Sequence, residues 1–257
     1  MSVGAFAWLP QGLPLWAAFL LVGLSFFTSA LTATFGLGGG LLMLAVLAQT
    51  LPASVVVPVH GIIQLGSNAG RAFVMRRESA WGAMLPFAVG SAFGIGLGGA
   101  LNVNLPSAVL QAAVGLFVLW SAMGTPGVAG GFGRLGLLGG GFLGGFLGMF
   151  VGATGPFAGA IWRRHGLERR AFVATHAASM VFQHGLKILA FGALGFAFAP
   201  WLPLLALVVA SGFLGTLLGK RLLDRLDERL FQSSLKAILI ALGLQLVLSA
   251  LWEAWRG

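Results

Sequence analysis

Apolar stretches long enough to cross a lipid bilayer recur along the whole of this 257-residue chain. A membrane-spanning helix needs about 20 consecutive, predominantly apolar residues. Only 8% of the residues are charged, against about a quarter in a soluble domain, and the mean hydropathy is +0.96. The longest polar run, Lys220 to Arg229, has ten residues and leaves no room for a soluble domain. The sequence therefore predicts an all-helical protein that crosses the membrane several times.

The distribution of basic residues and the lack of cysteine narrow the function classes further. The net charge is +9, but the arginines and lysines lie mostly in short loops, where they are topology signals rather than a nucleic-acid surface. No lysine or arginine precedes Arg71, so the first apolar stretch lacks the charged start of a cleavable signal peptide and is interpreted as a retained span. The absence of cysteine excludes disulfides, thiolate metal sites and thiol-based sulfur transfer.

The two halves of the chain resemble each other when the second half is shifted by 116 residues. A fixed shift of this kind is the mark of an internal repeat. The repeat predicts two structural units, residues 1–123 and 134–257, joined by a linker at residues 124–133. The shift superimposes rare polar residues, namely His60 on His176, Asn68 on His184 and Arg71 on Lys187.

Each half contains five apolar segments. The second segment of each half is too short to cross a hydrocarbon core of about 30 Å as a helix. Each half is therefore predicted to hold a glycine-broken hairpin, made of a helix and a half-helix, and three further spanning helices. The segments are residues 13–34, 40–50, 53–75, 81–102 and 106–123 in the first half, and 134–151, 156–163, 171–196, 201–219 and 230–251 in the second.

The basic loops of one half correspond to uncharged loops of the other half. Arg76 and Arg77 follow the third segment of the first half, whereas the matching loop near Pro200 is uncharged. The arginines within residues 163–170 precede the third segment of the second half, and their counterpart, residues 49–54, is uncharged. Because cytoplasmic loops carry the excess of lysine and arginine, the halves are predicted to be inverted, with both termini outside. Inverted repeats with interrupted helices are a recurring architecture of secondary transporters.

The glycine-rich breaks are the first candidate site. Backbone that leaves a helix at membrane depth is tolerated only inside protein or along a watered cavity. A half-helix that begins there would point its N-terminal amides and the positive end of its dipole inward, which suits an anion. The alternative is a crossing motif in which glycine only permits close helix contact. The candidate residues are Gly38, Gly39 and Gly40 in the first break, and Thr154, Gly155 and Pro156 in the second.

The third segment of each half carries a stripe of polar residues on one helix face, which forms the second candidate site. Such a stripe does not face lipid, because unpaired polar groups are costly there. It either lines a substrate pathway or forms a hydrogen-bond network between helices, with its terminal cations reaching to opposite interfaces. We favour pathway-lining for the two matched histidines. The stripes comprise His60, Gln64, Ser67, Asn68 and Arg71 in the first half, and His176, Ser179, Gln183, His184 and Lys187 in the second; all of these except the two serines are candidate substrate ligands.

The six acidic residues all lie in loops or near the C-terminus, so no carboxylate is expected inside the spans. Histidine, amide, hydroxyl and cationic groups remain there, and this combination favours an anionic ligand. Histidine is then the only side chain suited to a proton relay near neutral pH, and proton coupling is a hypothesis. Neither a metal site nor a cofactor is predicted. An intramembrane enzyme is disfavoured, because the histidines have no acidic or cysteine partner.

At the glycine-broken segments the chain resembles the TauE/SafE family of sulfite and organosulfonate exporters. The resemblance rests on Gly36-Leu37-Gly38-Gly39-Gly40 after the first span, and on the stretch from Gly144 to Pro156 in the second half. It extends to the polar third segment and to the chain length. This chain departs from the family pattern in its second glycine run, which reads Gly-Ala-Thr-Gly-Pro, and in lacking a proline between residues 41 and 49.

The resemblance implies a secondary transporter for a small sulfur-containing anion such as sulfite, sulfoacetate or another organosulfonate. Two alternatives stay open, an anion channel and a carrier for a small organic anion without sulfur. We expect a multi-pass protein of the bacterial inner membrane that moves its substrate by alternating access. The expected partners are the anion and the lipid bilayer, with a coupled proton and a second copy of the chain in a homodimer as further hypotheses.

Overall fold

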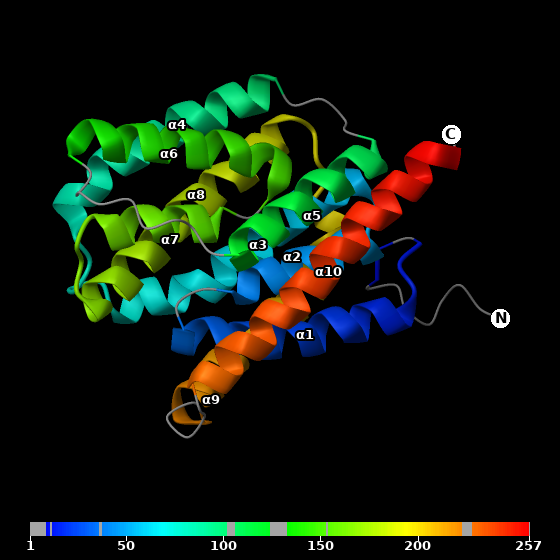
Figure 1. Ribbon diagram of the computed structural model, residues 1–257, viewed down its shortest axis with the longest axis horizontal. Helices are drawn as coiled ribbons and strands as arrows, with labels where there is room; N and C mark the ends of the chain where they lie inside the picture. Colours follow the sequence, from blue (N-terminus) through cyan, green and yellow to red (C-terminus); the bar gives the residue numbers. More distant parts are fainter. Residues whose placement is uncertain are drawn as a thin grey trace.

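The computed structural model describes residues 9–10, 12–35, 38–101, 106–123, 133–152, 154–222 and 228–256. Within these ranges the chain is helical and contains no β-strand (Figure 1). The helices of the first half are α1 (Leu15–Phe35), α2 (Gly39–Thr50), α3 (Ala53–Val74), α4 (Trp81–Ala100) and α5 (Ser107–Met123). Those of the second half are α6 (Arg134–Val151), α7 (Gly155–Arg164), α8 (Arg169–Ala193), the 3-10 turn η1 (Ala199–Trp201), α9 (Leu202–Leu222) and α10 (Glu228–Arg256).

Each predicted apolar segment corresponds to one α-helix, with bounds that differ by a few residues. Helices α3 and α8 are long but carry the polar stripes, and α2 and α7 are short. The prediction of an all-helical, multi-pass membrane protein is confirmed. Residues 124–132 of the predicted linker lie outside the described residues, so the division into two domains stays a prediction. In the described part, five stretches are long and apolar enough to cross a membrane, namely Leu15–Ala33, Trp81–Ala100, Arg134–Val151, Ala199–Leu218 and Lys236–Trp255.

Helices α4 and α6 come from different halves and pack against each other through glycine. A Cβ atom at Gly90 would overlap the Leu138 carbonyl of α6, and one at Gly94 would overlap the Phe142 carbonyl. Small residues let helix backbones approach this closely in a membrane. From the first contact to the second, the residue number rises by four in both helices, so α4 and α6 run parallel.

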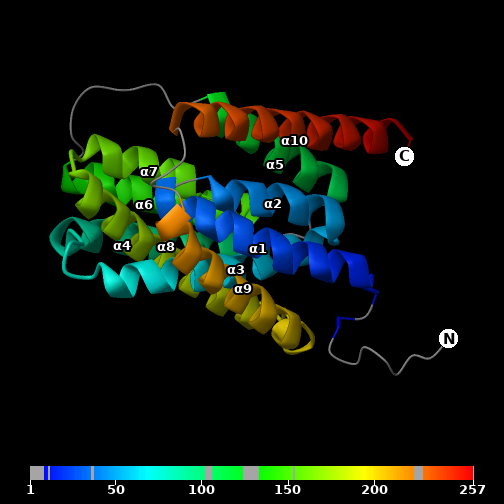
Figure 2. The same cartoon turned by 90° about the horizontal axis from the view of Figure 1, so that it is seen from below.

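Helices α1 and α9 also pair across the two halves, and serine contributes to their contact. Ser211 Oγ in α9 donates a hydrogen bond to the Val22 carbonyl in α1 at 2.7 Å. One turn further on, a Cβ atom at Gly215 would overlap the Phe26 carbonyl. This pair is therefore parallel as well (Figure 2).

Helices α3 and α8 lie side by side at the centre and run in opposite directions. The loop after α3 meets the start of α8, where Glu78 lies 3.9 Å from Arg170 and the Ala80 amide donates to Thr175 Oγ1 at 2.9 Å. The basic loop after α3 and the basic loop before α8 thus share one end of the molecule. The opposite directions of this pair agree with inverted halves, but the inverted relation of the complete halves stays a prediction.

Helix α2 lies inside the protein. Helices α5 and α10 form a pair that packs against α2 (Figure 2), while α1 and α3 contact it from other sides. Its side chains Met43, Leu44 and Leu47 have no exposed surface. The residues of its first turn, from Gly39 to Leu42, are buried or partly buried, so α2 begins within the protein rather than at a lipid interface.

The α4–α6 contact generates a prediction with a matched control on the same helix. Gly94→Ala places a Cβ atom on the Phe142 carbonyl, which is backbone and cannot rotate away. We expect a loss of about 1–3 kcal/mol of stability, the usual cost of overpacking. Gly96→Ala meets nothing within 4 Å and serves as the control. The measurement is thermal unfolding of both variants in detergent, and equal melting temperatures would contradict the close contact.

Candidate functional site

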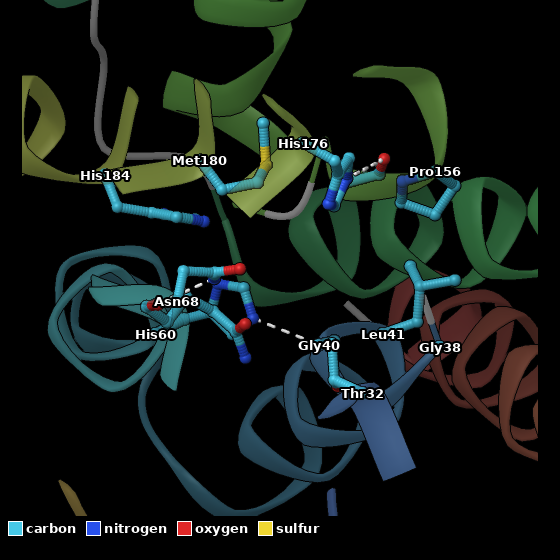
Figure 3. Close-up of a pocket in the computed structure, with 12 residues that line it drawn as sticks. Thr32, Gly38, Gly40, Leu41, His60, Asn68, Pro156, His176, Met180 and His184 are labelled. Carbon is cyan, nitrogen blue, oxygen red and sulfur yellow. Dashed lines mark hydrogen bonds between the residues drawn. The ribbon is translucent and has the colours of Figure 1, made fainter. Parts of the chain in front are cut away.

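A cavity lies where the first turns of α2 and α7 meet the middle of α3 and α8 (Figure 3). Residues from both halves of the chain surround it. The cavity is lined by Thr32, Gly38, Gly40, Leu41, His60, Gln64, Asn68, Gly155, Pro156, His176, Met180 and His184.

The first break places the N-terminus of α2 on this cavity. Gly38 precedes the helix with φ 105°, a left-handed conformation that glycine adopts without a steric penalty. The amides of Leu41 and Leu42 donate to the Gly38 carbonyl at 3.1 Å and begin the helical hydrogen bonds. The amides of Gly39 and Gly40 precede these bonds and are not used within α2.

The second break places the N-terminus of α7 on the same cavity. Gly152 ends α6 with φ 89°, and the Ala158 amide donates to the Thr154 carbonyl at 2.9 Å to begin α7. Pro156 occupies the first turn, where its missing N–H group interrupts no helical bond. The positive ends of two helix dipoles thus meet at one cavity, an arrangement that favours negative charge.

One histidine from each central helix fixes one of these N-termini. His60 Nε2 on α3 lies 3.0 Å from the Gly40 carbonyl, and His176 Nε2 on α8 lies 3.0 Å from the Gly155 carbonyl. A carbonyl oxygen only accepts hydrogen bonds, so both rings donate from Nε2. The ring of His184 lies edge-on to that of His60, with centroids 5.8 Å apart.

The polar stripe of α3 continues away from the cavity toward a buried cation. Asn68 Nδ2 donates to the Gln64 carbonyl and Asn68 Oδ1 accepts from Arg71 Nη2, both at 2.7 Å. Arg71 is 7% exposed and lies behind Asn68 rather than on the cavity surface. Its Nη1 has no hydrogen-bond partner in the part of the chain that the structure describes. Arg71 therefore supplies positive charge to the site from behind Asn68.

The corresponding residues of α8 hold the second break together. Lys187 is 2% exposed, and its Nζ donates to the carbonyls of Gly148 at 3.4 Å and Gly152 at 2.5 Å, at the C-terminal end of α6. Gln183 accepts from Thr154 Oγ1 at 3.0 Å and donates to Ser91 Oγ at 2.9 Å. A cation at a helix C-terminus stabilises the carbonyls that have no partner within the helix.

The candidate residues therefore fall into two groups. The cavity brings together Gly38, Gly40, His60, Gln64, Asn68, Gly155, Pro156, His176 and His184. The remaining five lie behind it, namely Gly39, Arg71, Thr154, Gln183 and Lys187. Gly39 packs on α1, where a Cβ atom would overlap the Thr28 carbonyl, so it permits close helix contact.

Sequence reasoning missed three residues of the lining: Thr32, Leu41 and Met180. Met180 lies four residues after His176 and four before His184, so helical spacing alone could have identified it. Leu41 and Thr32 belong to otherwise apolar helices, and no pattern in the sequence separates them from their neighbours. These side chains give the cavity apolar walls beside its polar groups.

The contacts of Lys187 allow a test of whether this residue stabilises the fold or serves only to bind the ligand. Lys187→Met leaves the Gly148 and Gly152 carbonyls without their charged donor. We expect a loss of about 1.5–3 kcal/mol of stability, as for hydrogen bonds to charged groups. Lys236→Met, at an exposed position of α10, is the control. The measurement is thermal unfolding in detergent without any added anion. An unchanged melting temperature would mean that Lys187 does not support the break.

The comparisons with known proteins agree with this architecture. The family model described as sulfite exporter TauE/SafE matches residues 21–246, which include both breaks and both central helices. No curated protein and no solved structure matches the chain. The match extends over most of the sequence and confirms the resemblance carried by the glycine-rich segments. The chain therefore belongs to the sulfite exporter TauE/SafE family.

Proposed function

We propose that this protein is a secondary carrier that binds a small sulfur-containing oxyanion, sulfite or an organosulfonate, in the cavity between α2, α3, α7 and α8. Membership of the family implies a membrane transporter of sulfite or related sulfur anions. The observation that carries the proposal for this site is the meeting of two helix N-termini at one cavity. Amides at such ends bind oxyanions without any additional charged ligand.

The charges around the cavity support an anion rather than a cation. Two cations, Arg71 and Lys187, are buried in the central helices. Among the described residues no carboxylate lines the cavity; Glu78 and Glu168 lie in loops, and Glu228 and Glu253 lie within α10. A cation would find no counter-charge here, whereas an oxyanion would meet helix dipoles and buried positive charge.

Alternating access by two inverted repeats is the transport mode that we propose. If the halves are exchanged, α1 corresponds to α6 and α4 to α9. The parallel pair α1–α9 then corresponds to the parallel pair α4–α6, and the antiparallel pair α3–α8 corresponds to itself. The matching bonds of His60 and His176 to the two breaks support the same relation. In transporters of this type the two repeats move against each other around a central site.

We further propose that transport is coupled to a proton and that the protein forms a homodimer. We also propose that it lies in the bacterial inner membrane with both termini outside. The coupling is supported by the three histidines that line the cavity. Histidine is the side chain best suited to exchanging or sharing a proton near neutral pH.

A transport measurement tests carrier function directly. The purified protein is reconstituted in proteoliposomes, and uptake of radiolabelled sulfite is followed with and without unlabelled sulfite inside. We expect uptake that saturates and is accelerated by the internal substrate. Uptake that does not saturate, together with an ohmic current, would identify a channel. Absence of any uptake of sulfite or sulfonates would refute the proposed substrate class.

The first turn of α2 gives a mutational test of the site. A Cβ atom at Gly40 would lie 3.1 Å from Gln64 Oε1, so Gly40→Ala pushes the carboxamide into the cavity. We expect sulfite affinity to fall by roughly tenfold, or about 1.4 kcal/mol. Gly185→Ala on α8 meets nothing within 4 Å and is the matched control. Affinity is measured by the ligand-induced thermal shift. The same affinity in both variants would place the anion elsewhere.

A further inference from the structure

The ring of His60 offers a hydrogen-bond acceptor that the protein does not use. Nε2 of His60 donates to the Gly40 carbonyl, which leaves the lone pair of a neutral ring on Nδ1. Nδ1 of His60 and Nδ1 of His184 are both buried and have no partner with hydrogen-bond geometry within the described ranges, although the backbone of Gly152 also lies near the His60 ring. His60 is fully buried and still lines the cavity. Buried polar atoms without a partner are rare, and at a binding site they indicate a contact that the ligand completes.

In the part of the chain that the structure describes, the charged groups near these rings are cations. The ionisable groups that face the three rings are Lys187 on α8, Arg71 on α3 and Arg163 at the end of α7, besides the rings themselves. The sequences of α1, α2 and α5 contain no ionisable side chain. A second proton on His60 would therefore add a buried positive charge without a carboxylate to pair with it, which is costly.

An unpaired acceptor beside two helix N-termini defines an unusual ligand. A fully deprotonated oxyanion presents only acceptor oxygens, which suit the helix amides but repel a bare ring nitrogen. A ligand that also carries a hydrogen-bond donor satisfies both sets of groups. An ammonium group is a poor candidate for this donor, because two buried cations already lie nearby and no carboxylate faces the cavity. An O–H group on the anion carries no additional positive charge.

We infer that the species bound is the acid form of the oxyanion, such as hydrogensulfite, with its O–H donated to Nδ1 of His60 and its other oxygens at the N-terminus of α2. This inference rests on the proposed function and specifies the protonation state of its substrate. No covalent step is involved, and the proton stays on the ligand. A carrier that accepts this species moves one proton with each anion, without a titrating relay in the protein.

The first test compares two ligands on the unmodified protein. Methanesulfonate, like hydrogensulfite, is a small sulfur oxyanion with one negative charge, but its sulfur carries three equivalent oxygens and a methyl group, so it has no O–H to donate. Affinity for each is measured across the pH range in which hydrogensulfite loses its proton.

We expect the affinity for total sulfite to fall by about tenfold for each pH unit above that transition, because only the acid form binds. Methanesulfonate should bind more weakly and with no pH dependence. If the affinities for both ligands fall together as the pH rises, the proton that titrates belongs to the protein. If the affinity for sulfite stays constant, the dianion binds. Either result overturns the inference.

The second test uses a substitution that keeps the donor function of the His60 ring and removes its acceptor function. His60→Gln retains an N–H group able to reach the Gly40 carbonyl and removes the Nδ1 acceptor. We expect this variant to lose the preference for hydrogensulfite over methanesulfonate. His165→Gln, at the end of α7 and outside the cavity lining, is the control and should keep the preference.

The outcomes distinguish this inference from the proposed function. If the unmodified protein binds neither ligand, the proposed function fails. If it binds both and His60→Gln keeps the preference, the carrier stands and the role of Nδ1 is wrong. The ligand comparison on the unmodified protein decides the inference even if the His60 variant does not fold.

Discussion

The whole arrangement depends on satisfying backbone groups where two helices break inside the protein. Breaking a helix at membrane depth exposes amides and carbonyls that lipid cannot hydrogen-bond. At the second break, Lys187 covers the Gly148 and Gly152 carbonyls, and His176 binds the Gly155 carbonyl. At the first break, His60 binds the Gly40 carbonyl. All of these partners come from α3 and α8, so the antiparallel central pair fixes the position of both half-helices.

The contacts of the two buried cations bear on the charge that the cavity presents, although neither Arg71 nor Lys187 is among its described lining residues. The C-terminal end of α6 would place partial negative charge close to the N-terminal end of α7. Lys187 compensates that end, so that the positive end of α7 is not opposed by α6. Arg71 adds positive charge from behind Asn68. Neither cation is among the residues that line the cavity, and both add positive charge to its surroundings.

Much of this fold follows from hydropathy and glycine placement. Long apolar segments predict the spans, and the glycine-rich breaks with their short half-helices predict where helix N-termini enter the protein. The spacing of His60, Gln64 and Asn68 correctly places them on one helix face. What the sequence cannot determine is which polar groups bind each other. The sequence makes Lys187 a candidate substrate ligand, because a hydropathy pattern does not show that its ammonium group can reach the carbonyls of Gly148 and Gly152 at the end of α6. Leu41 lines the cavity as well, but an apolar residue in the largely apolar α2 carries no distinguishing pattern.

Pro156 makes the two half-helices chemically unequal despite their similar positions. Proline has no N–H group, so the first turn of α7 lacks an amide that the first turn of α2 provides. For the anion that we propose to bind in this cavity, the first turn of α2 therefore offers one more backbone donor than the first turn of α7. In a carrier whose repeats alternate, this inequality gives different half-saturation concentrations on the two sides of the membrane. The net direction of transport would still follow the solute gradients, so the asymmetry tunes the working concentration on each side and not the direction of flow.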